Sequence, residues 1–87
     1  MATEVVPRTF PAPARRGRRF VVRRANAVDR LVRAGITRQH ADAWIEAWLE
    51  STIGLKDFRA ADDYWEMGFQ YAIEERRRGY LPPGLPD

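Results

Sequence analysis

Residues 37–55, TRQHADAWIEAWLESTIGL, decide the fold of this 87-residue chain. Apolar side chains recur in this stretch three and four positions apart, which is the period of one buried face of an α-helix. They are Ala41, Trp44, Ile45, Trp48 and Leu49. Thr37 is a good N-terminal cap and Gly54 a good C-terminal stop. The stretch therefore predicts an amphipathic helix that buries two tryptophans, with acidic residues 42, 46 and 50 on its opposite side.

Two more helices are predicted, one on each side of this stretch. Asn26 is suited to cap a short helix of about nine residues that ends at Gly35. A longer helix is expected from a cap at Asp57 to about Arg78, and Gly79 would stop it. Its inner face is predicted to hold Phe58, Ala61, Trp65, Gly68, Phe69 and Ala72.

The fold class expected from these elements is all-α. We expect a three-helix body dominated by an antiparallel helical hairpin, whose two long helices are locked by Trp44, Trp48, Trp65 and Phe69. Residues 1–19, rich in Arg and Pro, are interpreted as an extended, flexible basic arm, and residues 20–79 as the helical domain. Prolines in residues 80–87 predict an extended tail.

Composition excludes several classes of function. The chain has no Cys and a single His, so a disulfide or a four-ligand zinc site is not expected, and no other metal or cofactor is expected. His40 and Ser51 have no catalytic context, and we expect no enzyme and no small-molecule substrate. No run approaches about 20 apolar residues, so no membrane partner is expected. A chain without Cys and without an export signal suits the cytoplasm.

Charge is distributed unevenly along the chain. Residues 1–24 hold seven Arg and one Glu, a net charge of +6, whereas the other residues hold eight basic and eleven acidic side chains, a net charge of −3. The residues expected to bind nucleic acid or an acidic partner are Arg15, Arg16, Arg18, Arg19, Arg23 and Arg24. Guanidinium groups bind phosphates and carboxylates, but the same composition also suits a tail that only improves solubility.

An alternative interpretation is a DNA-binding helix-turn-helix. The short turn at Gly35 precedes a capped helix whose first turn carries Arg38, Gln39 and His40, the candidate base-reading residues. The acidic residues further along this helix would repel phosphates. A plain helical hairpin explains the same pattern and is favoured here.

Three residues form a second apolar strip on the longer helix: Tyr64, Met67 and Tyr71. A helix that is apolar on more than one face must bury both faces, and a body of this size offers little surface to cover them. We therefore expect this strip to contact a protein partner or a second copy of the chain. Gly68 beside it costs about 1 kcal/mol of helix propensity relative to alanine, which suggests a packing role.

The run at residues 31–37, LVRAGIT, is followed by Ala41-Asp42-Ala43-Trp44 and Trp48, and later by Asp63-Tyr64-Trp65 and Gly68. Together these segments resemble small uncharacterised helical proteins of actinobacteria and their phages, over the central half of the chain. The resemblance implies a helical body and an accessory role in a phage or mobile element, in the host cytoplasm or the virion.

The function expected from the sequence is a non-enzymatic interaction module. Its helical body would dock on a protein partner or on itself, while the basic arm grips nucleic acid or an acidic surface. The alternative is the helix-turn-helix regulator described above.

Overall fold

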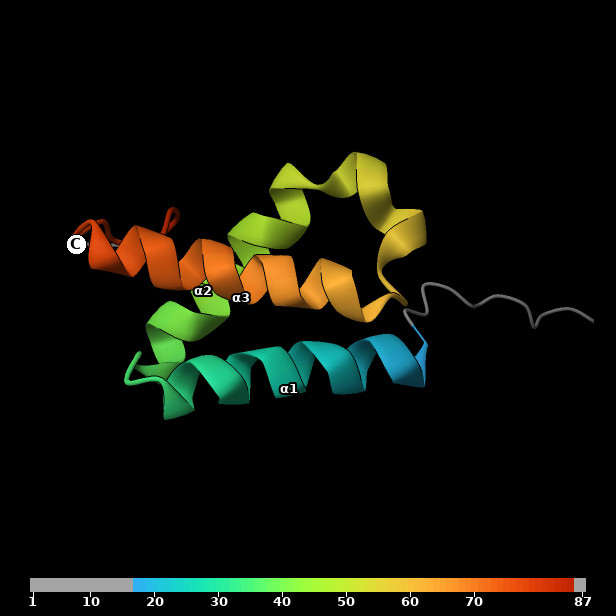
Figure 1. Cartoon of the computed structure of the whole chain (residues 1–87), viewed down its shortest axis with the longest axis horizontal. Helices are drawn as coiled ribbons and strands as arrows, with labels where there is room; N and C mark the ends of the chain where they lie inside the picture. Colours follow the sequence, from blue (N-terminus) through green and yellow to red (C-terminus); the bar gives the residue numbers. More distant parts are fainter. Residues whose placement is uncertain (1–16, 86–87) are drawn as a thin grey trace, which may run out of the picture.

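The computed structural model describes residues 17–85, and these residues form an all-helical body. The elements are α1 (Arg18–Arg33), α2 (Arg38–Ser51), the 3-10 segment η2 (Ile53–Phe58) and α3 (Asp62–Arg77). In Figure 1, α1 and α3 lie side by side and run in the same direction, and α2 crosses behind α3. Each of the three α-helices packs against the other two, so the predicted all-α, three-helix body is confirmed.

The N-terminus of α2 forms as the sequence predicts. The Thr37 hydroxyl accepts a hydrogen bond from the backbone N–H of His40, which confirms Thr37 as the cap. The C-terminus differs, because α2 ends at Ser51 and not at Gly54. There the Thr52 hydroxyl donates to the carbonyl of Trp48, so a side chain satisfies the end of the helix.

Helix α1 is longer than predicted. It starts at Arg18, eight residues before the expected cap at Asn26, and includes Arg18 and Arg19, which the sequence analysis assigns to the arm. The physical reason is packing: Phe20 meets the ring of Trp65 edge-on at 5.7 Å, which favours helix over the extended preference of the valines at 21 and 22. Residues 1–16 of the predicted arm, with Arg15 and Arg16, lie outside the described residues.

The turn from α1 to α2 follows the prediction. Gly35 has a φ of 99°, a conformation that side chains with a Cβ rarely adopt. The backbone N–H of Ile36 donates to the carbonyl of Leu31, and that of Gly35 donates to Val32, which together form a Schellman motif. Ile36 is then buried against the core, where it anchors the start of α2.

Helix α3 begins later than predicted. The sequence predicts a cap at Asp57, but residues 53–58 form η2 and α3 starts at Asp62. The backbone carbonyl of Arg59 accepts a hydrogen bond from Trp65 Nε1 at 2.6 Å, which bends the chain before the helix. As a result Phe58 and Ala61 are exposed and do not belong to the inner face.

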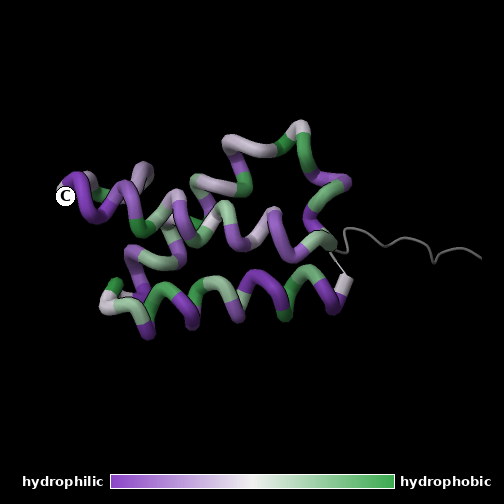
Figure 2. Tube along the Cα trace, viewed as in Figure 1, coloured by the Kyte–Doolittle hydropathy of each residue, from purple (hydrophilic) through white to green (hydrophobic). Residues whose placement is uncertain are grey.

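The core lies where the three helices meet, and Leu31, Trp44 and Ile45 are its largest fully buried side chains. Trp65 is buried, and Trp48 and Phe69 are partly buried against the same cluster. Figure 2 shows hydrophilic residues in purple alternating with hydrophobic residues in green along α1 and α3, as expected for amphipathic helices. After α3 the chain is non-helical: Pro82 is buried, and a turn at Pro83 and Gly84 brings the tail back beside α2.

Candidate anion-binding end of helix α1

Helix α1 carries six arginines, and the structure divides them by whether they form ion pairs. Arg23, Arg24 and Arg30 pair with acidic side chains of the body. Arg18, Arg19 and Arg33 form no ion pair with any residue between 17 and 85. The basic character of α1 is therefore partly structural and partly available to a ligand.

Two of these ion-paired arginines, Arg23 and Arg24, are residues that the sequence predicts to bind an anion. Arg23 Nη1 lies 2.7 Å from Asp62 Oδ1 at the start of α3. Arg24 bridges two acidic residues of α2, with Nη1 2.8 Å from Asp42 Oδ1 and Nη2 2.7 Å from Glu46 Oε2. Both arginines thus tie α1 to the body.

The environment of Arg24 keeps its guanidinium charged. Partial burial acts to lower the pKa of Arg24, but hydrogen bonds to Glu46 and Asp42 outweigh it and raise the pKa above its ordinary value. A ligand would have to compete with two carboxylates for this side chain. Arg24 is for this reason a poor candidate for binding an external anion.

Arg30 forms a clamp between α1 and α3 that sequence reasoning missed. Its two terminal nitrogens lie 2.6 and 3.2 Å from the two carboxylate oxygens of Glu66, and its guanidinium carbon is 3.9 Å from the centre of the Phe69 ring. Two parallel hydrogen bonds and a cation–π contact act on one side chain. Residues 30 and 66 are far apart in sequence, so no local pattern signals this contact.

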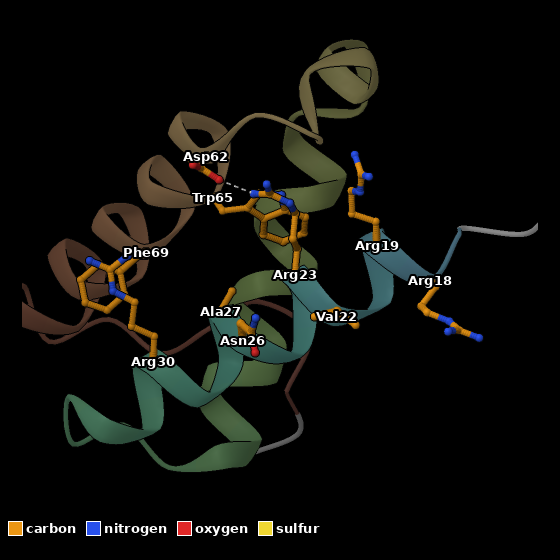
Figure 3. A pocket seen from close by; sticks show the side chains of 10 residues that line it. All are labelled: Arg18, Arg19, Val22, Arg23, Asn26, Ala27, Arg30, Asp62, Trp65 and Phe69. Atoms are coloured by element: carbon orange, nitrogen blue, oxygen red, sulfur yellow. Dashed lines mark hydrogen bonds and ion pairs between the residues drawn. The ribbon is translucent and has the colours of Figure 1, made fainter.

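Arg18 and Arg19 lie at the mouth of a groove between α1 and α3. The groove has a volume of about 840 Å³, and its walls include Val22, Trp65 and Phe69. In Figure 3 the side chains of Arg18 and Arg19 extend away from the groove, whereas Arg23 reaches across it to Asp62. Both free arginines are exposed, in the first turn of α1.

This arrangement can bind an anion without reacting with it. Two exposed guanidinium groups offer many N–H donors to phosphate or carboxylate oxygens, and neither forms an ion pair within residues 17–85. The chain continues directly from Arg18 through Gly17 to Arg16 and Arg15, so four arginines fall within five residues. Clustered guanidiniums of this kind favour a polyanion over a single small anion.

The alternative DNA-reading residues lie at the N-terminus of α2. Arg38 pairs with Asp29 at 2.9 Å, the His40 ring packs edge-on against Trp44 at 6.0 Å, and Gln39 is exposed. One objection from the sequence is reduced, because Arg24 of α1 pairs with Asp42 and Glu46 of α2 and offsets one of their two negative charges. Glu50 forms no ion pair within residues 17–85.

The predicted protein-binding strip is not one continuous exposed surface. Tyr64 is 4% exposed, and its hydroxyl lies 2.6 Å from that of Thr52. Tyr71 is half-buried, with its ring 5.7 Å from that of Trp48. Only Met67 is largely exposed. Trp48 of α2 covers Tyr64 and Tyr71, because Gly68 lets its indole approach α3 closely.

Neither a metal centre nor a membrane span is found in the described part of the chain. Within residues 17–85 no three acidic or histidine side chains gather closely enough to hold a metal ion. No described helix combines the length and the apolar character needed to cross a membrane. Comparison with known proteins adds no assignment: no family model, curated protein or solved structure matches this chain.

Proposed function

We propose that this protein is a non-enzymatic interaction module that binds the phosphate backbone of nucleic acid through the basic start of α1. The ligating groups are Arg18 and Arg19, together with Arg15 and Arg16 of the preceding segment. Consistent with the resemblance noted above, we further propose that it serves as a phage-borne accessory protein in the host cytoplasm or the virion.

One observation carries this proposal. Arg18 and Arg19 are exposed and form no ion pair within residues 17–85, whereas Arg23, Arg24 and Arg30 are engaged by carboxylates of the body. Some arginines of α1 thus stabilise the fold through ion pairs, whereas Arg18 and Arg19 at its start remain available to a ligand. Free arginines beside a phosphate backbone displace condensed counterions, which favours binding at low salt.

The test is the salt dependence of binding to a labelled 20-base-pair duplex, measured by fluorescence anisotropy with the full chain. If the four arginines each contact a phosphate, the logarithm of the affinity falls against the logarithm of salt concentration with a slope of about −3.5. The double variant Arg18→Gln/Arg19→Gln removes two contacts. We expect its slope to become less steep by about 2.

The matched control removes the same charge elsewhere. Arg77→Gln/Arg78→Gln changes two exposed arginines that pair with Glu74 at the other end of the molecule. We expect this variant to keep the slope of the parent protein. Equal slopes for both double variants, or binding to poly-glutamate in preference to the duplex, would contradict the proposal; the latter result points to an acidic protein surface.

A second candidate is the helix-turn-helix regulator, which the pairing of Arg24 with Asp42 and Glu46 favours. That pairing reduces the repulsion that α2 would present to phosphates. The variant Arg38→Gln/Gln39→Ala separates the two candidates. It should leave binding to a duplex of random sequence unchanged under the first proposal, whereas a regulator would lose its preference for a selected sequence.

A further inference from the structure

A pocket lined by cationic side chains lies between the start of α1 and the segment η2. The cations are Arg19 and Arg23 of α1, Lys56 of η2, and Arg59, which follows η2 directly. The pocket has a volume of about 420 Å³. In Figure 3 the Arg19 side chain points away from the groove between α1 and α3, and it also lines this pocket. The pocket therefore adjoins the exposed basic start of α1.

Three of these four cations have no carboxylate partner in the described part of the chain. Arg23 is the exception, because it pairs with Asp62. Arg19, Lys56 and Arg59 form no ion pair with any residue between 17 and 85. Three positive charges that face one pocket repel each other, so an anion placed among them lowers their electrostatic energy.

Arg59 is the cation for which a missing counter-ion matters most. It is only partly exposed, and a charge that is partly removed from water needs a compensating partner. Its Nε and Nη2 donate to two uncharged oxygens, the hydroxyl of Tyr64 and the carbonyl of Leu49. Its Nη1 donates to no residue between 17 and 85. An anion in the pocket would balance the charge of Arg59.

One carboxylate, that of Asp57, also lines the pocket. Asp57 is exposed and forms no ion pair within residues 17–85, so it does not engage the cations by direct contact. With Asp62 included, two carboxylates stand against four cations, and a net charge of +2 remains. Asp57 therefore weakens the attraction of the pocket for an anion without cancelling it.

The backbone at the start of α1 adds charge of the same sign. No side chain caps the helix at Gly17, and its first turn contains no acidic residue. The first N–H groups of a helix carry a partial positive charge, which favours an anion nearby. The helix end and the pocket side chains thus favour the same kind of ligand.

From these observations we infer that the pocket holds a phosphate group of the bound nucleic acid, with Arg19, Lys56 and Arg59 as its donors. A phosphate accepts hydrogen bonds from several directions, which suits donors that come from two elements. The nucleic acid thus contacts η2 as well as α1. This inference rests on the proposed function, because the backbone that reaches the pocket is the one bound at the start of α1.

The experiment applies the duplex titration over a salt series to the full chain with Lys56→Gln. Loss of a phosphate contact should weaken binding several-fold at low salt and make the salt slope less steep by about 1. The matched control is Arg33→Gln, because Arg33 is also exposed and unpaired within residues 17–85. It lies at the other end of α1, about 20 Å from Arg19 along the helix axis, and should keep the slope.

Asp57→Asn tests the same pocket with the opposite sign. It removes the carboxylate that opposes the ligand, so we expect binding to become several-fold tighter at low salt. Glu50→Gln is its control, because Glu50 is exposed and unpaired in the described part of the chain but lines the groove between α2 and the tail. An equal gain in both variants would reflect net charge alone and would overturn the inference. Circular dichroism verifies the fold of each variant.

The remaining outcomes separate this inference from the proposed function. If Arg18→Gln/Arg19→Gln flattens the salt slope and Lys56→Gln does not, the pocket inference alone is overturned. If the parent chain shows no salt-dependent binding, the proposed function fails as well. Competition by inorganic pyrophosphate at matched ionic strength tests a free phosphate compound as the ligand. Displacement of the duplex at micromolar pyrophosphate, lost in Lys56→Gln, would overturn the backbone phosphate as the occupant.

Discussion

Gly68 and Trp48 show how a single atom sets the distance between two helices. A Cβ built at Gly68 would lie 2.7 Å from Cδ1 and 2.9 Å from Nε1 of the Trp48 indole, closer than real Cβ contacts come. The indole has little freedom to move, because its ring packs against those of Tyr64 and Tyr71 at 5.5 and 5.7 Å. The glycine is thus needed for the contact between α2 and α3.

We expect Gly68→Ala to lower the free energy of unfolding by up to about 2 kcal/mol. The clash with a rigid ring costs about 1–3 kcal/mol, and the gain of about 1 kcal/mol in helix propensity offsets part of it. Urea denaturation followed by tryptophan fluorescence measures the difference. The control is Gly54→Ala, because no atom lies within 4 Å of a Cβ at Gly54 and its φ is not positive. A stabilised Gly68→Ala protein would contradict the packing argument.

At the scale of elements, Arg59 holds the connection between α2 and α3 in place. Its Nη2 donates to the carbonyl of Leu49 at 2.8 Å, and its Nε donates to the hydroxyl of Tyr64 at 3.2 Å. The Tyr64 hydroxyl also meets that of Thr52. These bonds join the end of α2 to the start of α3 and define the path of η2 between them.

Replacing Arg59 by Met keeps the length of the side chain and removes its donors. We expect Arg59→Met to lose about 1–2 kcal/mol of stability, since a part-buried carbonyl and hydroxyl lose a charged donor. Arg33→Met, at an exposed position without an ion pair within residues 17–85, should stay within about 0.5 kcal/mol of the parent. Thermal denaturation compares them, and similar losses in both variants would argue against a locking role for Arg59.

At the scale of the whole molecule, ion pairs between helices make the fold sensitive to acid. The hydrogen bond from Arg30, and then that from Gln70, lowers the pKa of Glu66 below its ordinary value of 4.5. A carboxylate whose pKa is lower in the folded state stabilises the fold above its unfolded pKa. That stability is lost as the pH falls through the folded pKa.

We therefore expect the urea midpoint to decline as the pH falls below about 4.5, with a smaller decline in Glu66→Gln. The measurement is a series of urea titrations between pH 7 and pH 3. Asp57→Asn serves as the control, because Asp57 forms no ion pair in the described part of the chain. If Glu66→Gln and the parent decline equally, the Arg30 clamp does not contribute to acid sensitivity.

Local rules were enough to predict much of this fold. The 3-4 spacing from Ala41 to Leu49 predicts the buried face of α2, and its cap at Thr37 and the stop at Gly35 are also found. Each of these features depends on residues within one or two turns of each other, where backbone geometry and capping energies act. The all-α class follows from them.

Other features depend on contacts between distant residues, which no local pattern reports. The contact between Phe20 and Trp65 lengthens α1 through residues that favour a strand-like conformation. The hydrogen bonds of Arg59 hold the chain in a different path, so that α3 begins only at Asp62. The same holds for the candidate site: the arginine run is visible in the sequence, but which arginines are free is decided by the carboxylates that α2 and α3 bring to α1. A helix propensity of a few tenths of a kcal/mol per residue is outweighed by such tertiary contacts.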